Sequence, residues 1–204
     1  MPQPLAYLRE SPSQTAGPYV HIGCTPAQCG IDVYPHDLGA VMKTGPVQGQ
    51  EITLTGTVYD GTGTPLRDAL VEIWQADAAG LYPSANEARG AADPNFTGWG
   101  RSAGDAETGA FVFDTVKPGQ VPYRDGRMQA PHITLWIVAR GINLGLHTRA
   151  YFADEAAANA VDPILTRIEH QNRLPTLLAE ATGPGTYRFD VHLQGPHETI
   201  FFDI

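Results

Sequence analysis

The feature that most constrains this chain is a two-residue alternation of apolar and polar side chains, which begins just after residue 50. Between residues 52 and 59, aliphatic side chains alternate with hydroxyl-bearing ones: Ile52, Leu54 and Val58 against Thr53, Thr55, Thr57 and Tyr59. Successive side chains of a β-strand point to opposite faces of the sheet, so this pattern predicts a strand with an aliphatic face and a threonine face. Strand-forming runs recur at 69–75, 110–116, 133–139, 186–193 and 199–202.

Turn-forming residues separate these runs. The chain has 22 glycines and 17 prolines, which are spread through it rather than gathered in one linker. Glycine tolerates a positive φ, so we expect Asp60–Gly63 to form the tip of a hairpin between the strands at 52–59 and 69–75. Short strands at this density, with turns between them, predict a mainly β fold of the β-sandwich type.

Helical signals are confined to one short insertion near residues 154–181. The run 154–160 is rich in alanine and starts with acidic residues, which suit the positive end of a helix dipole. Asp162 followed by Pro163 is typical of a helix start, and we expect 174–181 to add a further turn or two.

The first 50 residues show no clear period, and we expect them to form an extended N-terminal arm with loops. No internal repeat or second domain is visible. We therefore expect one domain over residues 1–204, with the arm and loops in 1–50 and the sandwich in 50–204.

The charge of the chain excludes several classes of partner. Thirteen basic against 22 acidic side chains give a formal net charge of −9. A negative surface repels phosphate backbones and anionic lipid, so we expect neither nucleic-acid nor membrane binding. The N-terminus lacks the basic start and apolar run of a secretory signal, and no apolar stretch approaches the roughly 20 residues that span a bilayer. We expect a cytoplasmic protein in which Cys24 and Cys29 are free thiols, too few for a structural zinc site.

The familiar motifs for phosphate binding, nucleophilic catalysis and paired-cysteine metal sites are absent from the sequence. The seven histidines are scattered, and no two of them stand two or four residues apart. Composition and periodicity alone therefore indicate only a soluble β-sandwich.

A more specific signal comes from seven short segments that occur in a fixed order. They are Thr15–Tyr19, Glu72–Asp77, Asp93–Arg101, Thr115–Gly119, Ala130–Ile133, Ala139–Gly141 and His147–Asp154. Together they resemble the intradiol dioxygenases, which open catechol-type rings with ferric iron. The match covers about residues 10–155, and the C-terminal Phe201–Ile204 is compatible with it.

The resemblance implies where an iron site would stand. In iron-bearing members, two tyrosines and a His-x-His pair hold the ferric ion, because hard phenolate oxygens neutralise its charge and imidazoles complete the set. The corresponding positions here are Tyr82, Val121, His132 and Thr134. Valine has no donor atom, and a neutral threonine hydroxyl is a poor substitute for imidazole. We therefore expect neither a metal site nor a catalytic residue in this chain, and we expect Tyr82 and His132 to fill the vacated cavity. Tyr123 lies ~7 Å too far along an extended segment to replace the missing tyrosine.

This partial loss resembles one group within the family, in which two homologous chains assemble and only the β chain binds Fe(III). The resemblance implies that this chain is the iron-free, α-type partner of an iron-binding β subunit, in a higher-order αβ oligomer that acts on a small aromatic substrate. It also implies that Thr15, Gly17 and Pro18 line the partner's pocket. Arg140 would lie near the mouth and attract a carboxylated catechol. Gly17–Pro18 is also a common turn, and Arg140 could instead pair with a surface acid.

Two other classes of protein stay open at this point. One is a self-sufficient enzyme, either an intradiol dioxygenase with rearranged ligands or a hydrolase, although no nucleophile motif supports a hydrolase. The other is a non-enzymatic, transthyretin-like β-sandwich that binds a partner. Such modules are commonly secreted, and neither the lack of a signal nor the motif-bearing N-terminal arm fits that interpretation.

Overall fold

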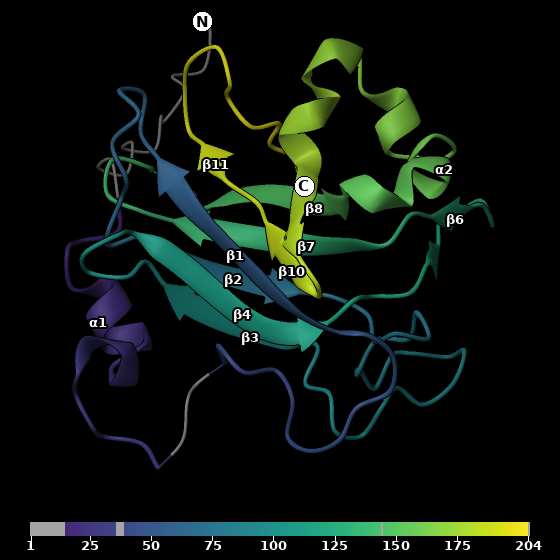
Figure 1. Cartoon of the computed structure of the whole chain (residues 1–204), viewed down its shortest axis with the longest axis horizontal. Coiled ribbons are helices and arrows are strands. Elements are labelled where there is room, and N and C mark those ends of the chain that lie inside the picture. Colours follow the sequence, from purple (N-terminus) through teal and green to yellow (C-terminus); the bar gives the residue numbers. More distant parts are fainter. Residues whose placement is uncertain (1–14, 36–38, 144, 204) are drawn as a thin grey trace, which may run out of the picture.

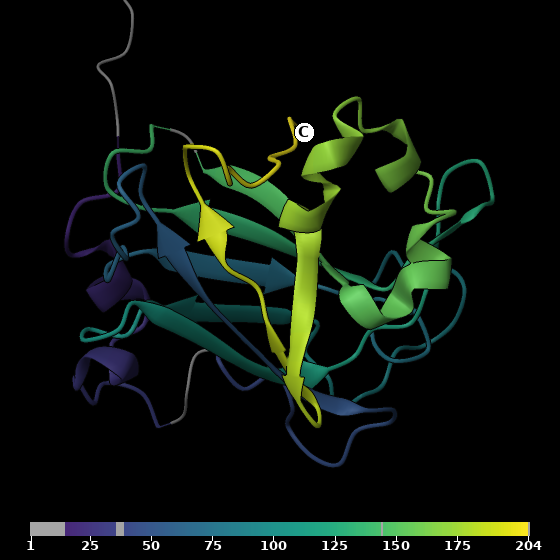
Figure 2. The ribbon, with the colours of Figure 1, turned by 45° about the horizontal axis from the view of Figure 1, so that its top comes forward.

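The computed structural model describes residues 15–35, 39–143 and 145–203. Two β-layers pack face to face, with a short helix at one end and a helical insertion at the other (Figure 1, Figure 2). One layer is centred on β1 (Glu51–Tyr59). An antiparallel strand, β4 (Ala110–Val116), lies on one side of β1, and two short parallel strands, β10 (Thr186–Arg188) and β11 (Val191–His192), lie on the other.

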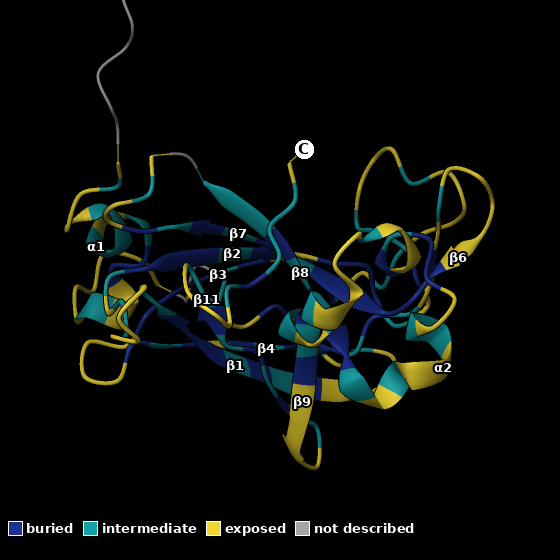
Figure 3. Ribbon diagram, turned by 90° about the horizontal axis from the view of Figure 1, so that it is seen from above, coloured by how far each residue is buried: buried dark blue, intermediate teal, exposed yellow. Residues whose placement is uncertain are grey.

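The second layer is antiparallel and consists of four strands in the order β3 (Trp99–Ala103), β2 (Leu70–Trp74), β7 (His132–Val138) and β8 (Leu146–Phe152). β9 (Leu178–Gly183) joins the layers, because it pairs in parallel with β8 and antiparallel with β10. The result is one continuous sheet that folds over on itself, and Figure 3 shows β2 and β7 above β1 and β4. A separate hairpin contains β5 (Val121–Pro122) and β6 (Met128–Gln129).

The core between the layers confirms the predicted sandwich. Ile52, Leu54 and Val58 of β1 are at most 2% exposed. They belong to one cluster with buried side chains from both layers, which include Ile73, Phe111, Phe113, Ile133, Leu135 and Ile137. Burying each such side chain contributes about 1.5–3 kcal/mol. Thr57 departs from the expected alternation because it is also buried, and its N–H donates to Oδ1 of Asp190 at 3.0 Å.

Gly56 allows the C-terminal segment to cross very close to β1. A Cβ at this position would lie 1.8 Å from the carbonyl oxygen of Phe189 and 2.6 Å from the ring of Phe111. The run at 186–193, predicted as one strand, is split here into β10 and β11. Phe189 turns its ring into the core, and the next residue, Asp190, bonds β1 through its side chain instead of extending the ladder.

The predicted hairpin between β1 and β2 is wrong. β1 pairs with β4, β10 and β11, whereas β2 pairs with β3 and β7 in the other layer. The turn itself forms, since Oδ1 of Asp60 accepts hydrogen bonds from the N–H groups of Thr62 and Thr64 at 2.8 and 2.9 Å. The chain then bridges back to β1 only at Pro65, which has no N–H with which to extend a ladder.

The helical insertion ends earlier than predicted. It consists of η2 (Ala153–Glu155), α2 (Ala156–Asn159), η3 (Leu165–Arg167) and η4 (Gln171–Leu177), of which only α2 is α-helical. The helical turn expected to reach residue 181 is wrong from Leu178 onward, because Leu178 and Ala179 pair with β8 at the start of β9.

The strand predicted at 199–202 is also wrong, apart from a single bridge between His147 and Phe202. The N–H groups of this segment bond to three different elements. Thr199 donates to the carbonyl of His192 at 2.9 Å, and Ile200 donates to the hydroxyl of Thr176 at 3.2 Å. A segment that ties several elements together in this way cannot form one ladder.

The N-terminal arm is not uniformly extended as predicted, because it contains α1 (Val20–Cys24) and η1 (Ala27–Cys29). The hydroxyl of Thr25 donates to the carbonyl of His21 at 2.6 Å and closes α1. A helix of five residues leaves no periodicity for sequence analysis to detect. Cys24 and Cys29 are both free. Residues 1–14 of the predicted arm, and Ile204, lie outside the described residues.

Candidate functional site

The four positions that correspond to iron ligands lie on the outer face of the second layer and on the loops beside it. Strand β7 alternates between the core and this face. Ile133 is fully buried in the core, so His132 and Thr134 point to the opposite side. Register pairing places Thr134 between Trp74 of β2 and Arg149 of β8.

Tyr82 reaches this face from the loop that follows β2. Its ring stacks on Trp74, with 5.7 Å between ring centroids and 11° between planes. The loop is fixed by Asp77, whose Oδ1 accepts two backbone hydrogen bonds from the following turn, both at 2.9 Å. Burial raises the pKa of Tyr82 against the opposing charge of Arg149, so its side chain is a neutral phenol at pH 7.

The second tyrosine position is filled by Val121, which is 3% exposed and pairs with Gln129 across the β5–β6 hairpin. Tyr123 does not take over the role of a ligand. Its hydroxyl accepts a hydrogen bond from Arg167 of η3 at 2.9 Å, and this contact ties the hairpin to the helical insertion.

His132 is buried at the start of β7. Its Nδ1 lies 2.8 Å from the carbonyl oxygen of Ala130, and its ring packs against Tyr151 with 5.4 Å between centroids. Burial, together with the nearby guanidinium of Arg149, lowers the pKa of His132 to about 4. The imidazole is therefore neutral at pH 7 and donates from Nδ1 to that carbonyl.

Arg149 is the residue that sequence analysis missed. From β8, its Nη1 donates to Oε1 of Gln129 at 2.8 Å and to the hydroxyl of Tyr151 at 3.4 Å. Gln129 is the register partner of Val121, and Arg149 is the register partner of Thr134. The guanidinium thus lies among the vacated ligand positions. Arg149 belongs to the segment His147–Asp154, which is one of the seven that carry the family resemblance. The sequence does not show that this arginine lies beside Thr134, because that placement depends on the pairing of β7 with β8.

These residues do not fit a ferric ion. The resemblance requires two phenolates and two imidazoles, whereas the four corresponding positions of this chain hold one tyrosine, Tyr82, and one histidine, His132. Their neighbour Arg149 is a cation and not a ligand. Within the described part of the chain, no group of three or more His, Cys, Asp or Glu side chains is arranged to hold a metal ion.

The predicted pocket-lining residues lie at the other end of β7. The hydroxyl of Thr15 donates to the carbonyl of Ala139 at 3.2 Å and accepts from the N–H of Gly141 at 2.9 Å. The structure therefore brings Thr15 beside Arg140. Seven residues of strand, or roughly 23 Å at the usual rise, separate Ala139 from His132. Thr15 is therefore far from His132 and Thr134 of its own chain.

Gly17 and Pro18 follow Thr15 in exposed backbone. The side chain of Arg140 is 61% exposed and forms an ion pair with Asp68 through Nε. The pairing of Arg140 with an acidic side chain, which the sequence left open, is thus present, although Asp68 is only 11% exposed; the Arg140 side chain as a whole stays largely exposed.

The segment 19–41, which we call the N-terminal apolar segment, exposes many large hydrophobic side chains. It supplies five of the ten that are exposed among the described residues: Tyr19 (77%), Ile31 (46%), Val33 (64%), Tyr34 (48%) and Val41 (49%). Concentration of such side chains on one segment is typical of a surface that contacts another protein.

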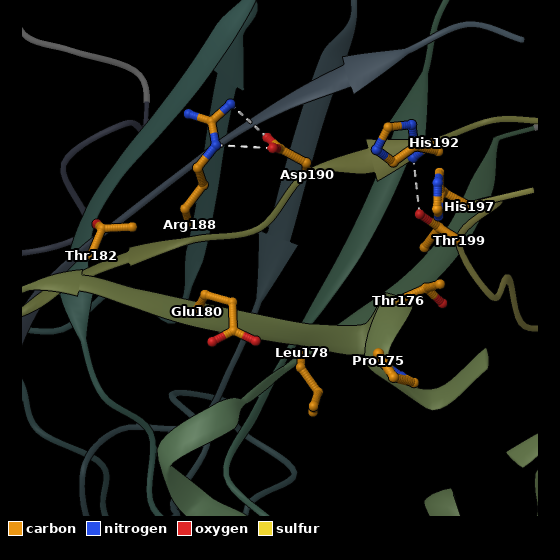
Figure 4. A pocket seen from close by; sticks show the side chains of 10 residues that line it. All are labelled: Pro175, Thr176, Leu178, Glu180, Thr182, Arg188, Asp190, His192, His197 and Thr199. Atoms are coloured by element: carbon orange, nitrogen blue, oxygen red, sulfur yellow. Dashed lines mark hydrogen bonds and ion pairs between the residues drawn. The ribbon is translucent and has the colours of Figure 1, made fainter. Parts of the chain in front are cut away.

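An open cavity of 360 Å³ lies between β9 and the C-terminal strands (Figure 4). Arg188 forms an ion pair with Asp190 at 2.8 Å, so its charge is neutralised. His192 and His197 stand nearby, with 6.2 Å between ring centroids. None of the predicted site residues lines this cavity, and its side chains include no arrangement of nucleophile and base.

The fold and the partly retained ligand set define a class of protein, and comparison with known proteins identifies it. A family model described as Dioxygenase matches residues 34–195. The chain belongs to the intradiol dioxygenase family. A solved structure of similar fold is 3-chlorocatechol 1,2-dioxygenase from Rhodococcus opacus 1CP, with 24% identity and a TM-score of 0.58, over 74% of this chain and 63% of that one.

Within the family, the similarity extends over nearly the whole chain to one of two homologous subunits. The chain is 45% identical over 203 residues to the protocatechuate 3,4-dioxygenase alpha chain of Pseudomonas putida, covering 98% of this chain and 99% of that one. The beta chain from Burkholderia cepacia is 36% identical over 174 residues, or 80% of this chain and 73% of that one. The predicted relation to the intradiol dioxygenases is confirmed, and the full-length similarity is to the alpha chains.

The described part of the chain contains no helix that is both long and apolar enough to cross a membrane.

Proposed function

We propose that this chain is the iron-free α-type subunit of a protocatechuate 3,4-dioxygenase, and that a homologous β chain in the same higher-order oligomer holds the Fe(III). One observation carries the proposal: Val121 and Thr134 replace two of the four ligands in a chain that keeps the family fold. The 45% identity to an alpha chain supports it. The complex uses O₂ to cleave 3,4-dihydroxybenzoate between its two hydroxyl-bearing carbons, and both oxygen atoms enter the product, 3-carboxy-cis,cis-muconate.

In this proposal the chain closes one wall of the partner's pocket. Gly17 permits close backbone approach, Pro18 fixes the turn, and the hydroxyl of Thr15 anchors the arm to the turn after β7. Arg140 lies beside this anchor, and its side chain is 61% exposed although Nε is paired with Asp68, which suits attraction of a substrate carboxylate. A local cation is needed because the chain carries a net charge of −9.

The iron content of each polypeptide tests the proposal. Elemental analysis is made on the folded chain purified alone and on the complex isolated from its native host. We expect no iron in the chain alone, and iron only together with a second chain of similar size. A near-stoichiometric ferric ion in the isolated chain would overturn the proposal.

Substitutions in the arm test its role in the complex. We expect Thr15→Val and Pro18→Ala to change KM or kcat severalfold while the iron content stays unchanged. Arg140→Gln should raise KM for 3,4-dihydroxybenzoate but not for catechol, which lacks the carboxylate. Arg124→Gln, at an exposed arginine of the β5–β6 hairpin, is the matched control. Loss of iron or of the complex in the arm variants would show that the arm is purely structural.

A further inference from the structure

A cation that belongs to the protein lies among the positions that correspond to the family's iron ligands. We propose that the guanidinium of Arg149 occupies the place of a metal ion in this chain. Two features then exclude iron: the positive charge of Arg149 and the loss of two ligands. This inference goes beyond the proposed function, which assigns the iron to the partner but does not say what excludes it here.

Contacts from several sides hold Arg149 in this place. Nη1 donates to Oε1 of Gln129 in β6 at 2.8 Å and to the hydroxyl of Tyr151 in β8 at 3.4 Å. Cζ lies 5.9 Å from the centre of the Phe202 ring. Thr134, which replaces the second histidine, is directly across the ladder. An amide oxygen, a phenol oxygen and an aromatic face all complement a positive charge.

The contacting side chains are themselves buried. Gln129 is 8% exposed and Tyr151 is 0% exposed, so Arg149 is held by fixed partners and does not move freely at the surface. An arginine side chain carries a positive charge in folded proteins. The positions that correspond to the iron ligands therefore have a permanent positive charge beside them.

The two retained ligand residues lie within the field of this charge. Arg149 contributes to the low pKa of His132, and it opposes the effect of burial on the pKa of Tyr82. A ferric ion bound by Tyr82 and His132 would stand close to a like charge, and the repulsion is strong in a partly buried site. Binding would require Arg149 to leave Gln129 without its hydrogen bond.

The effect of the Arg149 charge on iron binding can be separated from the effect of ligand loss. The two missing ligands are restored by substitution, once with Arg149 present and once with it replaced. The full-length chain with Val121→Tyr and Thr134→His retains Arg149, and we expect it to bind no iron. Adding Arg149→Gln should raise the iron content to about one per chain, with a phenolate-to-iron charge-transfer band in the visible spectrum. Adding Arg149→Lys instead keeps the charge and is the matched control, which should stay free of iron.

Iron in the variant that retains Arg149, or in the Lys control, would overturn the inference. Failure of the folded Gln variant to bind iron would also overturn it. Circular dichroism establishes that each variant is folded. None of these outcomes bears on the proposed function, which depends on the iron content of the unmodified chain and complex.

A second comparison avoids the buried position 121, where a tyrosine could prevent folding because Val121 is 3% exposed. Thr134→His alone changes a half-buried residue of the outer face. With Co²⁺ as the probe, we expect Thr134→His combined with Arg149→Gln to bind at least about tenfold more tightly than Thr134→His alone. The titration is followed by visible absorption, and equal affinities would contradict the inference.

Discussion

At the scale of single residues, His132 shows how a side chain at a position that corresponds to an iron ligand is held by the rest of the protein. His132 keeps its place on β7, but its ring is buried against Tyr151 and its Nδ1 is bonded to a backbone carbonyl. An imidazole that is buried beside a guanidinium is stable only when it is neutral. The histidine has become part of the packing, and protonating it costs free energy.

We expect the chain to lose stability between pH 7 and pH 5 because of His132. Its pKa is lowered from the ordinary 6.5 to about 4 in the folded chain. As the pH falls through 6.5, the unfolded state therefore takes up this proton and the folded state does not. The free energy of unfolding should decrease by about 2 kcal/mol between pH 7 and pH 5, until the folded state is also protonated near pH 4.

Urea unfolding at the two pH values, for the natural chain and for His132→Gln, measures this effect. The variant should lack the His132 contribution, while all other titrating groups are the same in both proteins. An identical pH dependence of the two would show that His132 is not held neutral.

The sequence was sufficient to predict which residues stand at the ligand positions, because motifs mark them. It was not sufficient to predict the contacts between distant strands. Tyr82, Val121, His132 and Thr134 are found from motifs because each stands at a fixed distance from a recognisable neighbour. Arg149 is brought beside these positions by the pairing of β7 with β8 and of β5 with β6. No local pattern in the sequence gives that register.

At the scale of elements, the alternation of apolar and polar side chains predicted a strand reliably only where one face of that strand is buried and the other is not. The strands β1, β2, β4 and β7 lie within a residue of their predicted bounds. β3 was missed because Gly100 and Arg101 interrupt its pattern. β8 was missed because its core-facing positions include the polar Thr148 and the small Ala150, so strongly apolar and polar side chains do not alternate along it. The layer that each strand joins depends on packing between distant segments, which explains the wrong hairpin between β1 and β2.

Asp162 illustrates how one side chain joins two elements. The sequence predicted a helix start here, and the buried carboxylate accepts hydrogen bonds from the N–H groups of Ile164 and Leu165 at 2.7 and 2.8 Å. It also accepts from the N–H of Ala130, between β6 and β7, at 2.8 Å. The insertion is thereby fixed to the second layer of the sandwich.

We expect Asp162→Ala to lower the free energy of unfolding by about 3 kcal/mol, because three N–H groups lose their acceptor. Urea denaturation monitored by circular dichroism measures the change. Asp125→Ala, in the exposed turn of the β5–β6 hairpin, is the control and should leave stability almost unchanged. Equal effects of the two substitutions would refute this role for Asp162.

At the scale of the whole molecule, the N-terminal apolar segment is the surface that most clearly needs a partner. Its helix α1 lies at the end of the sandwich away from the helical insertion (Figure 1), and the segment carries five of the ten exposed large hydrophobic side chains among the described residues. The arm residues that we propose for the partner's pocket precede it directly in sequence. The single-domain organisation of residues 1–204 stays a prediction.

We expect Val33→Glu and Tyr19→Glu to weaken assembly with the β chain, because each places a charge on a surface that the partner would cover. Recovery of the β chain with a tagged variant should fall about tenfold, while the melting temperature of the isolated chain stays unchanged. Val161→Glu, at a valine that is 66% exposed on the insertion, is the matched control. Normal assembly of the first two variants would place the interface elsewhere.

The parallel pairing of β1 with β10 and β11 has a consequence for biosynthesis. One edge of β1 can be paired only by residues 186–192, which the ribosome adds long after β1 itself. Contacts between segments so far apart form slowly and leave a strand edge open in the meantime. The two layers can therefore close only after residues 186–192 have left the ribosome. A subunit that recognises the closed sandwich must associate after that point, and the nascent chain must be protected from aggregation until then.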